Sequence, residues 1–523
     1  MKSAAIASGL GCAALAFTLF GSGPQAATAA PPTAETCRTR DNNTVAKLLE
    51  CIQAGNLWQH LSEFQKIADQ NPSNDGHPNR NIGTPGYKAS ADHVAAMMRR
   101  AGYRVTIQPY HWKRFEVLGA PAFATPARTF TLSQDWFVAR LSPGGSVTAI
   151  VQPVGRSVGE DDGNTGCARE DFAGFVPGRI ALVRRGSCAV DTQVDNAVAA
   201  RASAIVIYNK AANSDSGRRE RSDGGAYQAL LDHPAAIPVV GVVSNAMGQE
   251  LLQQSRNGKL ATASLALHTR IKSDLDYNVI ADSPFGDPNH VIVVEGHLDA
   301  IYGAGMLDNA SGSTTILEIA LNMARTHTRN QLRYIWFGGE EVGLLGSKYY
   351  TQTLSHRDLK RIVFDIDADV TATPNFAILI ADPAHAHAVK TFPPNVVPQS
   401  RVGNKLFADY FRTIGIASRN AVFGNDGTDS LAFSRVGVPN SGILTQQDCC
   451  KRSWEVKIWG GFRGNYEGNI PSHDGGCVDN PGRWCDNLSN NDRFVFEFVS
   501  KGVAYTTYKL ANDDSLGAPT HRN

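Results

Sequence analysis

The stretch QLRYIWFGGEEVGLLGSKYY, residues 331–350, contains the pattern from which the fold of the chain can be worked out. It begins with a run rich in the aromatic and aliphatic residues that strands favour. Two adjacent carboxylates, Glu340 and Glu341, follow, and the segment from Ser347 reads as a helix. A strand that leads through a glycine-rich turn into a helix is one unit of an α/β sheet. The two glutamates are therefore predicted to lie at the mouth of a sheet.

The same alternation of strand and helix occurs on both sides of this stretch. Residues 290–297 (HVIVVEGH) read as a strand, residues 311–326 as a helix, and residues 358–370 (DLKRIVFDIDADV) lead into another strand. Near the N-terminus, residues 43–71 have apolar residues at helical spacing, and Ser90 is the expected N-cap of a helix over 91–100. Together these segments predict an α/β fold: a mainly parallel mixed sheet with helices on both faces.

The middle of the chain has a different character. Short β runs such as GRIALVRRG (178–186) and ASAIVIYNK (202–210) are separated by long polar loops and one helical segment. This composition predicts a separate small β-rich domain over residues 130–268, inserted into the larger one. The larger domain would then consist of residues 30–129 and 269–510, with residues 511–523 as a tail. A length of 523 residues agrees with more than one domain.

The first 29 residues have the features of a secretory signal peptide. Lys2 supplies a positive charge, residues 4–20 are apolar, and residues 27–29 form an Ala-Thr-Ala cleavage pattern. A membrane anchor is the alternative, but the apolar stretch is short and no second run of about 18 apolar residues follows. The protein is thus predicted to be secreted or periplasmic. We expect no membrane contact after removal of the signal.

The cysteine count agrees with export. Eight cysteines remain after the signal, an even number that indicates disulfides in an oxidising compartment. Cys37 with Cys51 and Cys167 with Cys188 are the natural local pairs. The other four form a C-terminal cluster whose pairing stays open: Cys449, Cys450, Cys477 and Cys485. The chain has 50 Lys and Arg residues against 49 Asp and Glu, which gives no sign of a nucleic-acid partner.

Side chains that bind metals gather at the ends of the predicted strands. His297 and Asp299 end one strand, Asp308 lies in the next loop, and Glu340 and Glu341 end another. In such sheets the active site lies outside the carboxyl ends of the strands. Carboxylate oxygens together with a neutral imidazole suit zinc. Asp299 is placed to accept the other ring N–H of His297 and fix its tautomer.

The order of these motifs resembles a known family. The chain has the motifs H-x-D, D-N-x-S-G and E-E-x-G-L-L-G-S in this order, which resembles the secreted co-catalytic di-zinc aminopeptidases. That family belongs to a superfamily that also contains glutamate carboxypeptidases, glutaminyl cyclases and transferrin receptors. The stretch NRNIGTPGYKASADHVAAMMRRAGY (79–103) is also similar to the family's N-terminal part. The middle domain resembles a protease-associated (PA) domain. The resemblance covers nearly everything after Cys37 and implies a zinc-peptidase fold of the phosphorylase/hydrolase-like class.

The resemblance implies a role for each matching residue. His297 would bind one zinc, Asp308 would bridge two, Glu341 would bind the second, and Glu340 would be the general base. Asp369 fits the family's spacing to a Pro-Asn pair and would complete the first zinc site, whereas Asp365 and Asp367 do not fit. Two Zn²⁺ ions per chain and peptide substrates are therefore implied.

Two further assignments rest on weaker similarity. His473 is the best candidate for the last zinc ligand, although Cys485 follows it after a step of twelve positions where relatives have a step of three, and Ser472 replaces their tyrosine. A plain loop residue is the other interpretation of His473. Asp429, in GNDGTDSLAF, takes the place of an acidic residue near the site, and a helix N-cap is an equally good role for it.

The resemblance favours a metallo-aminopeptidase that hydrolyses N-terminal residues from peptides. A carboxypeptidase or dipeptidase of the same architecture is the first alternative; Arg401, Arg419 and Arg435 could hold its substrate's free carboxylate. A glutaminyl cyclase or an inactive receptor-like relative is a more distant one. The PA domain has equally good interpretations as a substrate-binding or access-restricting part and as a purely structural lid.

Overall fold

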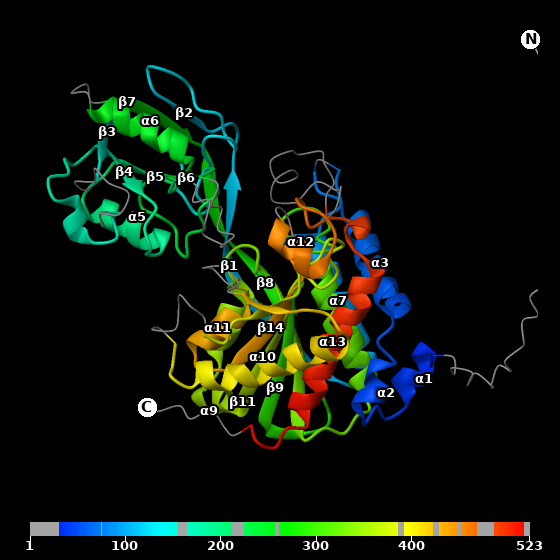
Figure 1. Ribbon diagram of the computed structural model, residues 1–523. Helices are drawn as coiled ribbons and strands as arrows, with labels where there is room; N and C mark the ends of the chain where they lie inside the picture. Colours follow the sequence, from blue (N-terminus) through cyan, green and yellow to red (C-terminus); the bar gives the residue numbers. More distant parts are fainter. Residues whose placement is uncertain are drawn as a thin grey trace, which may run out of the picture.

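The computed structural model describes residues 31–74, 76–154, 165–211, 224–256, 261–384, 392–421, 428–447, 451–467 and 486–516. The expected signal peptide, His473 and the four C-terminal cysteines lie outside these ranges. Within them the chain forms two β-sheets, each accompanied by helices, in two parts of the molecule (Figure 1). The larger part has helices on both faces of its sheet, as the sequence predicted.

The larger sheet has eight described strands in the order β1-β8-β10-β9-β11-β14-β12-β13. Its central four strands, β10, β9, β11 and β14, are parallel. Strand β8 runs antiparallel to β10 and to β1, and β12 runs antiparallel to β14 but parallel to β13. The strands are β1 (Arg104–Val117), β8 (Thr269–Asp282), β9 (Asp287–His297), β10 (Asn330–Phe337), β11 (Ile362–Ala368), β12 (Leu379–Ala381), β13 (Arg419–Ala421) and β14 (Asn440–Leu444). The sheet is therefore mixed with a parallel centre.

Two helical layers cover this sheet because its central strands are apolar on both faces. Ile292 and Val294 of β9 face one core, and Val291 and Val293 face the other. The first layer consists of α2 (Val45–Leu49), α3 (Ala54–Gln70), α4 (Pro85–Arg100), α7 (Ala310–Met323), α10 (Val396–Thr413) and α13 (Arg493–Ala511). Helix α1 (Ala34–Thr39) packs against α7. The second layer consists of α8 (Leu345–Thr353), α9 (His356–Arg361) and α11 (Ser430–Arg435), and α12 (Ser453–Trp459) lies at the end of the sheet.

The smaller part contains a six-stranded sheet in the order β2-β7-β3-β4-β5-β6. Strands β3 to β6 are parallel, and β7 joins them antiparallel. Its elements are β2 (Ala122–Ala124), β3 (Gly145–Pro153), β4 (Ile180–Arg184), α5 (Val190–Ala199), β5 (Ala204–Tyr208), β6 (Val239–Val243), α6 (Asn245–Arg256) and β7 (Thr262–Leu267). This sheet already begins at Ala122, before the boundary at residue 130 that the sequence suggested.

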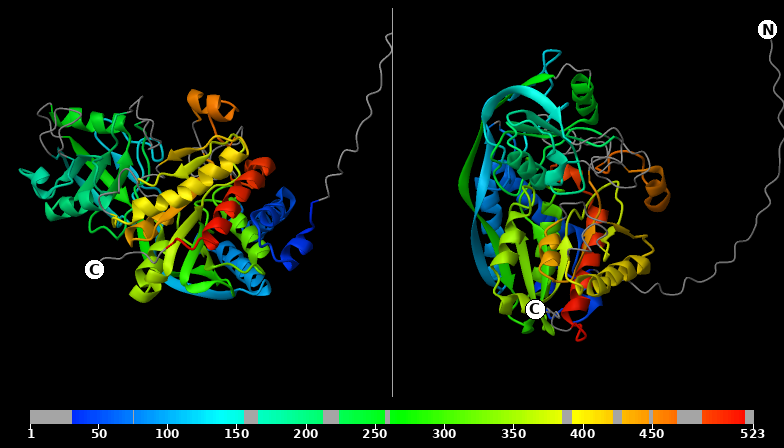
Figure 2. Two further views of the ribbon diagram at one scale, coloured as in Figure 1. Left: turned by 60° about the horizontal axis from the view of Figure 1, so that its bottom comes forward. Right: turned by 90° about the vertical axis from the view of Figure 1, so that its left-hand side faces the viewer.

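Two long strands connect the parts. β1 and β8 pair antiparallel over their whole length, from Arg104 opposite Asp282 to Val117 opposite Thr269. Figure 2 shows this ribbon running along one edge of the molecule from the larger sheet to the smaller part. The inserted domain thus leaves and rejoins the larger one through neighbouring strands. A hydrogen-bonded pair of strands restricts its movement more than two free linkers would.

Two expectations about the N-terminal helices need correction. The helix predicted from Ala91 begins at Pro85 instead, and the side chain of Thr84 caps it by accepting a hydrogen bond from the Tyr87 N–H. Ser90 is buried inside this helix, where its hydroxyl donates to the Gly86 carbonyl. Pro fits the first helical turn because that turn needs no N–H from it. The helical pattern over 43–71 is in fact two helices, α2 and α3, with a break between them.

The two local disulfides that the sequence predicted are present. Cys37 is bonded to Cys51 and Cys167 to Cys188. The first joins α1 to the residues just after α2, and the second lies in the inserted domain. In the described part of the chain, no helix is long and apolar enough to cross a membrane.

Candidate active site

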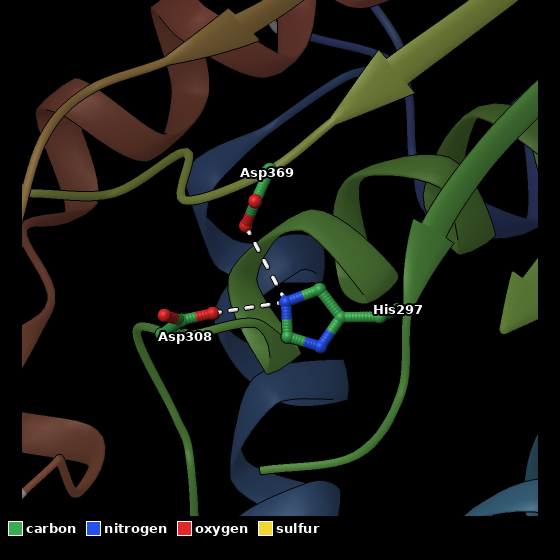
Figure 3. A group of neighbouring side chains, drawn as sticks. All are labelled: His297, Asp308 and Asp369. Carbon is green, nitrogen blue, oxygen red and sulfur yellow. Dashed lines mark ion pairs between the residues drawn. The ribbon is translucent and has the colours of Figure 1, made fainter. Parts of the chain in front are cut away.

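His297 is the centre of the site. It is the last residue of β9, and its Nε2 atom lies 3.0 Å from Oδ1 of Asp308 and 3.5 Å from Oδ1 of Asp369 (Figure 3). Its other ring nitrogen, Nδ1, lies 3.1 Å from the carbonyl oxygen of Asp299. A hydrogen bond from Nδ1–H to that carbonyl leaves the Nε2 lone pair facing the two carboxylates. The imidazole is therefore oriented as a metal ligand.

The two adjacent glutamates meet the same histidine. Oε2 of Glu340 lies 3.9 Å from Nε2 of His297. Two groups of side chains offer ligand atoms within 4.8 Å of one another: His297 with Asp308 and Asp369, and His297 with Glu340 and Glu341. Both groups share His297, so the structure brings all five residues to one place at the carboxyl ends of β9, β10 and β11.

A tight turn after β10 lets neighbouring residues face the same centre. The backbone folds back so that the Gly346 N–H donates to the Gly338 carbonyl, at 2.9 Å. A Cβ atom on Gly338 would lie 2.2 Å from the Tyr87 hydroxyl oxygen, and one on Gly346 would lie 2.3 Å from Oδ1 of Asn278. Only glycine fits at these two positions, which explains their place in the opening motif.

Asp299 ties the ends of two strands together. One carboxylate oxygen, Oδ1, accepts a hydrogen bond of 3.2 Å from the Glu340 N–H, while it lies 3.6 Å from Nδ1 of His297. The expected contact with the His297 ring is made more closely by the Asp299 backbone carbonyl. Glu341 is held from the same side, because its Oε1 accepts from the Ile301 N–H at 3.1 Å. Asp299 therefore orients both His297 and the glutamate turn.

The site contains more carboxylates than cationic side chains, so bound cations would stabilise it. Burial disfavours protonated His297, but the surrounding carboxylates, with Glu340 first among them, raise its pKa well above its ordinary value. Burial likewise raises the pKa of Glu340, and the nearby Glu341 and Asp429 add to the effect. Carboxylates crowded in a buried site need positive partners to stay ionised. The donor set of one imidazole and four carboxylates matches what zinc binds.

The structure separates Asp369 from the two aspartates before it. Asp369 follows β11 and reaches His297, whereas Asp365 and Asp367 are buried within the strand. Asp367 pairs in register with Glu295 of β9, a buried carboxyl that the sequence reasoning had not singled out. Burial raises the pKa values of Glu295, Asp365 and Asp367 well above the ordinary range, which favours their neutral forms. The spacing to Pro-Asn identified the aspartate that reaches His297.

Asp429 lies at the N-cap position of α11, but its side chain makes no capping hydrogen bond. It is buried, and this burial raises its pKa to about 7. His297, Asp299 and Asp369 are among the groups that influence its charge. The capping role considered from the sequence is thus not realised.

Two residues that support the site were missed from the sequence. The buried guanidinium of Arg80 donates to the carbonyl oxygens of Leu298 (2.9 Å), Ala304 (2.7 Å) and Gly305 (3.1 Å), in the loop between His297 and Asp308. The carboxylate of Asp486 accepts from the Leu307 and Asp308 N–H groups. Both act on backbone far away in sequence, so no local pattern indicates them. The sequence offered one indication of their importance: Arg80 lies in the motif NRNIGTPGY, and Asp486 lies in the motif CDNLSN.

The inserted domain touches the glutamate turn directly. Arg140 is 6% exposed, and it donates from Nη1 to the carbonyl oxygen of Val342 at 2.7 Å and from Nη2 to that of Lys113 at 3.1 Å. Val342 is the residue after Glu341. A second tie between the parts is the ion pair of Lys348 with Asp232, at 2.8 Å. Arg140 is thus a positioning residue for the glutamate turn.

Replacing Arg140 with methionine is expected to lower kcat about tenfold and to weaken zinc binding, because outer-shell partners typically contribute factors of 10–100. Zinc titration and steady-state kinetics measure both effects, and Arg140→Lys should recover part of them since lysine can still donate one bond. Lys348→Met removes the other tie as a control and should leave zinc affinity unchanged. Normal zinc affinity and kcat in Arg140→Met would show that the contact only anchors the domain.

Comparisons with known proteins place the chain in a family. Residues 278–463 match the model for peptidase family M28, and residues 148–251 match that for the PA domain. An aminopeptidase of Pseudomonas aeruginosa is 31% identical over 480 residues, covering 90% of this chain and 83% of the relative. A probable leucine aminopeptidase 2 of Aspergillus oryzae is 29% identical, covering 89% of this chain and 86% of the relative.

Solved structures agree on the fold. The aminopeptidase from Aneurinibacillus sp. strain AM-1 superimposes with a TM-score of 0.67 at 21% identity, covering 91% of this chain and 98% of that one. A zinc aminopeptidase from Bacillus subtilis gives a TM-score of 0.55 at 20% identity, covering 90% of this chain and 97% of that one. The family suggested by the order of H-x-D, D-N-x-S-G and E-E-x-G-L-L-G-S is thus confirmed, and the chain belongs to peptidase family M28, with a PA domain inserted in its peptidase domain.

Proposed function

We propose that this M28 peptidase is an exported zinc aminopeptidase that removes N-terminal residues from peptides and uses two zinc ions per chain. The observation that carries the proposal is the meeting of His297, Asp308, Asp369, Glu340 and Glu341 at the ends of three neighbouring strands. Relatives from Pseudomonas aeruginosa and Aspergillus oryzae named as aminopeptidases support the reaction. The Bacillus subtilis structure, named as a zinc aminopeptidase, supports the metal.

The side chains divide between two metal positions. His297 and Asp369 would hold the first ion and Glu341 the second, with Asp308 between the two. His473, which lies outside the described residues, remains the proposed further ligand of the second ion. The carboxylates of Asp308, Asp369 and Glu341 contribute three negative charges, and two zinc ions would contribute four positive ones. The site with both ions bound would therefore keep a net positive charge. When bound, zinc supplies Lewis acidity that polarises the scissile carbonyl and lowers the pKa of water at the site.

Glu340 is the proposed general base. Its carboxylate is close to His297 but is not needed as a ligand, so it is free to accept a proton from the attacking water and pass it to the leaving amine. Adjacent Glu341 stays ionised because it would bind a cation. The different neighbours of these two carboxylates give them different roles. Asp299 contributes indirectly by holding the His297 ring and the backbone of Glu340.

The alternatives have less support. The three arginines considered as holders of a free C-terminal carboxylate, Arg401, Arg419 and Arg435, are all exposed. A glutaminyl cyclase would use one zinc, rather than the two proposed here, so zinc analysis distinguishes it. A receptor-like relative would lack ligands. The predicted signal peptide and the two disulfides support export, and one relative is named as a probable lipoprotein aminopeptidase of Mycobacterium tuberculosis.

The experiment is a rate assay on three matched peptides, with a free N-terminus, an acetylated N-terminus or an amidated C-terminus. We expect acetylation to abolish cleavage and amidation to have little effect, since the free amine identifies the substrate of an aminopeptidase. A chelator should remove activity and added zinc restore it, with zinc analysis giving two ions per chain. Loss of cleavage on amidation would favour the carboxypeptidase alternative instead.

A further inference from the structure

A basic groove lies on the segment that includes α12. It is a cavity of about 780 Å³ lined by Lys451, Arg452, Ser453, Trp454, Lys457, Arg463 and Gly464. Helix α12 projects from the larger domain in both views of Figure 2. The whole chain has a formal net charge of only +1, so four cationic side chains around one groove are a local concentration of charge. This groove is separate from the residues assigned to the metal centre.

The charges of the groove are not neutralised by the described neighbours. Arg452, Lys457 and Arg463 form no ion pair with any residue that the structure describes. The acidic side chain on the same helix, Glu455, is buried and its oxygens are already used. Its Oε2 accepts from the Arg452 N–H at 2.7 Å and its Oε1 from the Tyr466 hydroxyl at 2.6 Å. The cationic side chains of the groove outnumber this one nearby carboxylate among the described residues, so the groove keeps a net positive charge.

Aromatic side chains accompany the cations. Trp454 is 41% exposed and Phe462 is 47% exposed, both unusually high for large apolar residues. The guanidinium of Arg419 lies over the Trp454 ring, 4.9 Å from its centroid, and adds a further positive charge beside the groove. A surface that combines cations with open aromatic rings suits an extended anionic peptide, whose carboxylates pair with the cations while its backbone lies against the rings.

The groove is attached to the loop that carries a proposed zinc ligand. Nζ of Lys451 donates to the Phe376 carbonyl at 2.7 Å, and Asn375 donates to the carbonyls of Phe462 (2.8 Å) and Asn465 (3.1 Å). Asn375 is six residues after Asp369, so this anchor is at most about 20 Å from it along the chain. An extended peptide rises about 3.3 Å per residue. Since this span is a maximum, a substrate with its N-terminus at the metal centre is long enough to reach the anchor of the groove by its sixth residue.

We propose that this groove, defined by Arg452, Trp454, Lys457 and Arg463, binds acidic residues in the downstream part of the peptide substrate. The proposal rests on the aminopeptidase function above, and it adds a preference for long peptides with carboxylates from about the sixth position onward. A peptide that is too short to reach the groove gains no binding affinity from it. Because the cations are at the surface, the effect weakens with ionic strength.

The test compares two peptides that share the sequence Leu-Ala-Gly-Ser-Gly and end in four aspartates or four asparagines. At about 50 mM salt we expect kcat/KM to be about tenfold higher for the aspartate peptide, mainly through KM, and the difference to shrink at about 0.5 M salt. Reversing two charges with Lys457→Glu and Arg463→Glu should abolish or invert this preference. The matched control, Arg357→Glu with Lys360→Glu on the distant α9, should retain it.

A binding measurement separates this proposal from the proposed function. Equilibrium binding of the same two peptides with acetylated N-termini requires no turnover. Tighter binding of the aspartate peptide, lost in the groove variant but kept in the α9 variant, supports the groove even if the peptides are cleaved in an unexpected way. Equal binding of both peptides by the wild-type protein, or a preference unchanged in the groove variant, overturns it even if aminopeptidase activity is confirmed.

Discussion

Replacing Glu340 with glutamine is expected to lower kcat about 10³-fold while both zinc ions stay bound. The substitution keeps the size and hydrogen-bonding shape of the side chain but removes its ability to accept a proton, and general bases typically contribute factors of 10²–10⁴. Glu340 is placed for this role by the turn after β10, which brings its Oε2 to 3.9 Å from Nε2 of His297. Steady-state kinetics on a peptide with a free N-terminus, with zinc analysis of the same sample, measures both quantities.

The adjacent residue supplies the control. Glu341→Gln changes the same chemical group one position further on, but it should weaken zinc binding because Glu341 is a proposed ligand. If Glu340→Gln retained full activity with a normal fold, the general base would have to be another residue. If it lost zinc instead, Glu340 would be a ligand and the roles of the two glutamates would be exchanged.

Replacing Asp308 with asparagine is expected to have the largest effect on the metal. A neutral amide cannot bridge two cations as a carboxylate does, so we expect zinc content to fall below one ion per chain and kcat/KM to fall at least about 10³-fold. Elemental analysis after dialysis and kinetics with excess zinc check this. The Asp308 N–H is held by Asp486, so the backbone should stay in place when the side chain changes.

Asp365→Asn is a matched control for this loss. It makes the same chemical change at a carboxyl buried in β11, four positions before Asp369 and within the strand. We expect this variant to keep two zinc ions. Full zinc occupancy in Asp308→Asn would contradict its place between the metals, and loss of zinc in Asp365→Asn would contradict the choice of Asp369 as the ligand.

Local sequence was sufficient for the elements that end at the site. The strands before His297 and Glu340 and the helix after Asp308 were predicted from their apolar runs, because burial on both faces of a central parallel strand requires such a run. The inserted domain was recognised from a change in composition. The N-terminal helix start was predicted six residues too late, since Ser90 has a good capping side chain but Thr84 and Pro85 compete for that end of the helix.

Contacts between residues far apart in the chain could not be predicted from local sequence. Each of the residues Arg80, Asp486 and Arg140 forms hydrogen bonds with backbone groups about 180 to 220 positions away, and such contacts leave no periodic pattern in the sequence. The row of buried carboxyls formed by Glu295, Asp365 and Asp367 depends on the register of β9 against β11. The unused capping position of Asp429 likewise became visible only in three dimensions.

The sequence by itself determined the fold class, the order of the metal-binding motifs and the family, because these depend on residue types at fixed local spacings. Only the tertiary structure decided which atoms meet. Parallel strands β9, β10 and β11 bring their carboxyl ends to one edge, where His297, Asp308, Asp369, Glu340 and Glu341 converge, and β1 and β8 hold the PA domain so that Arg140 reaches the glutamate turn. The physical reason is that a sheet joins residues by strand register and burial, neither of which follows from distance along the chain.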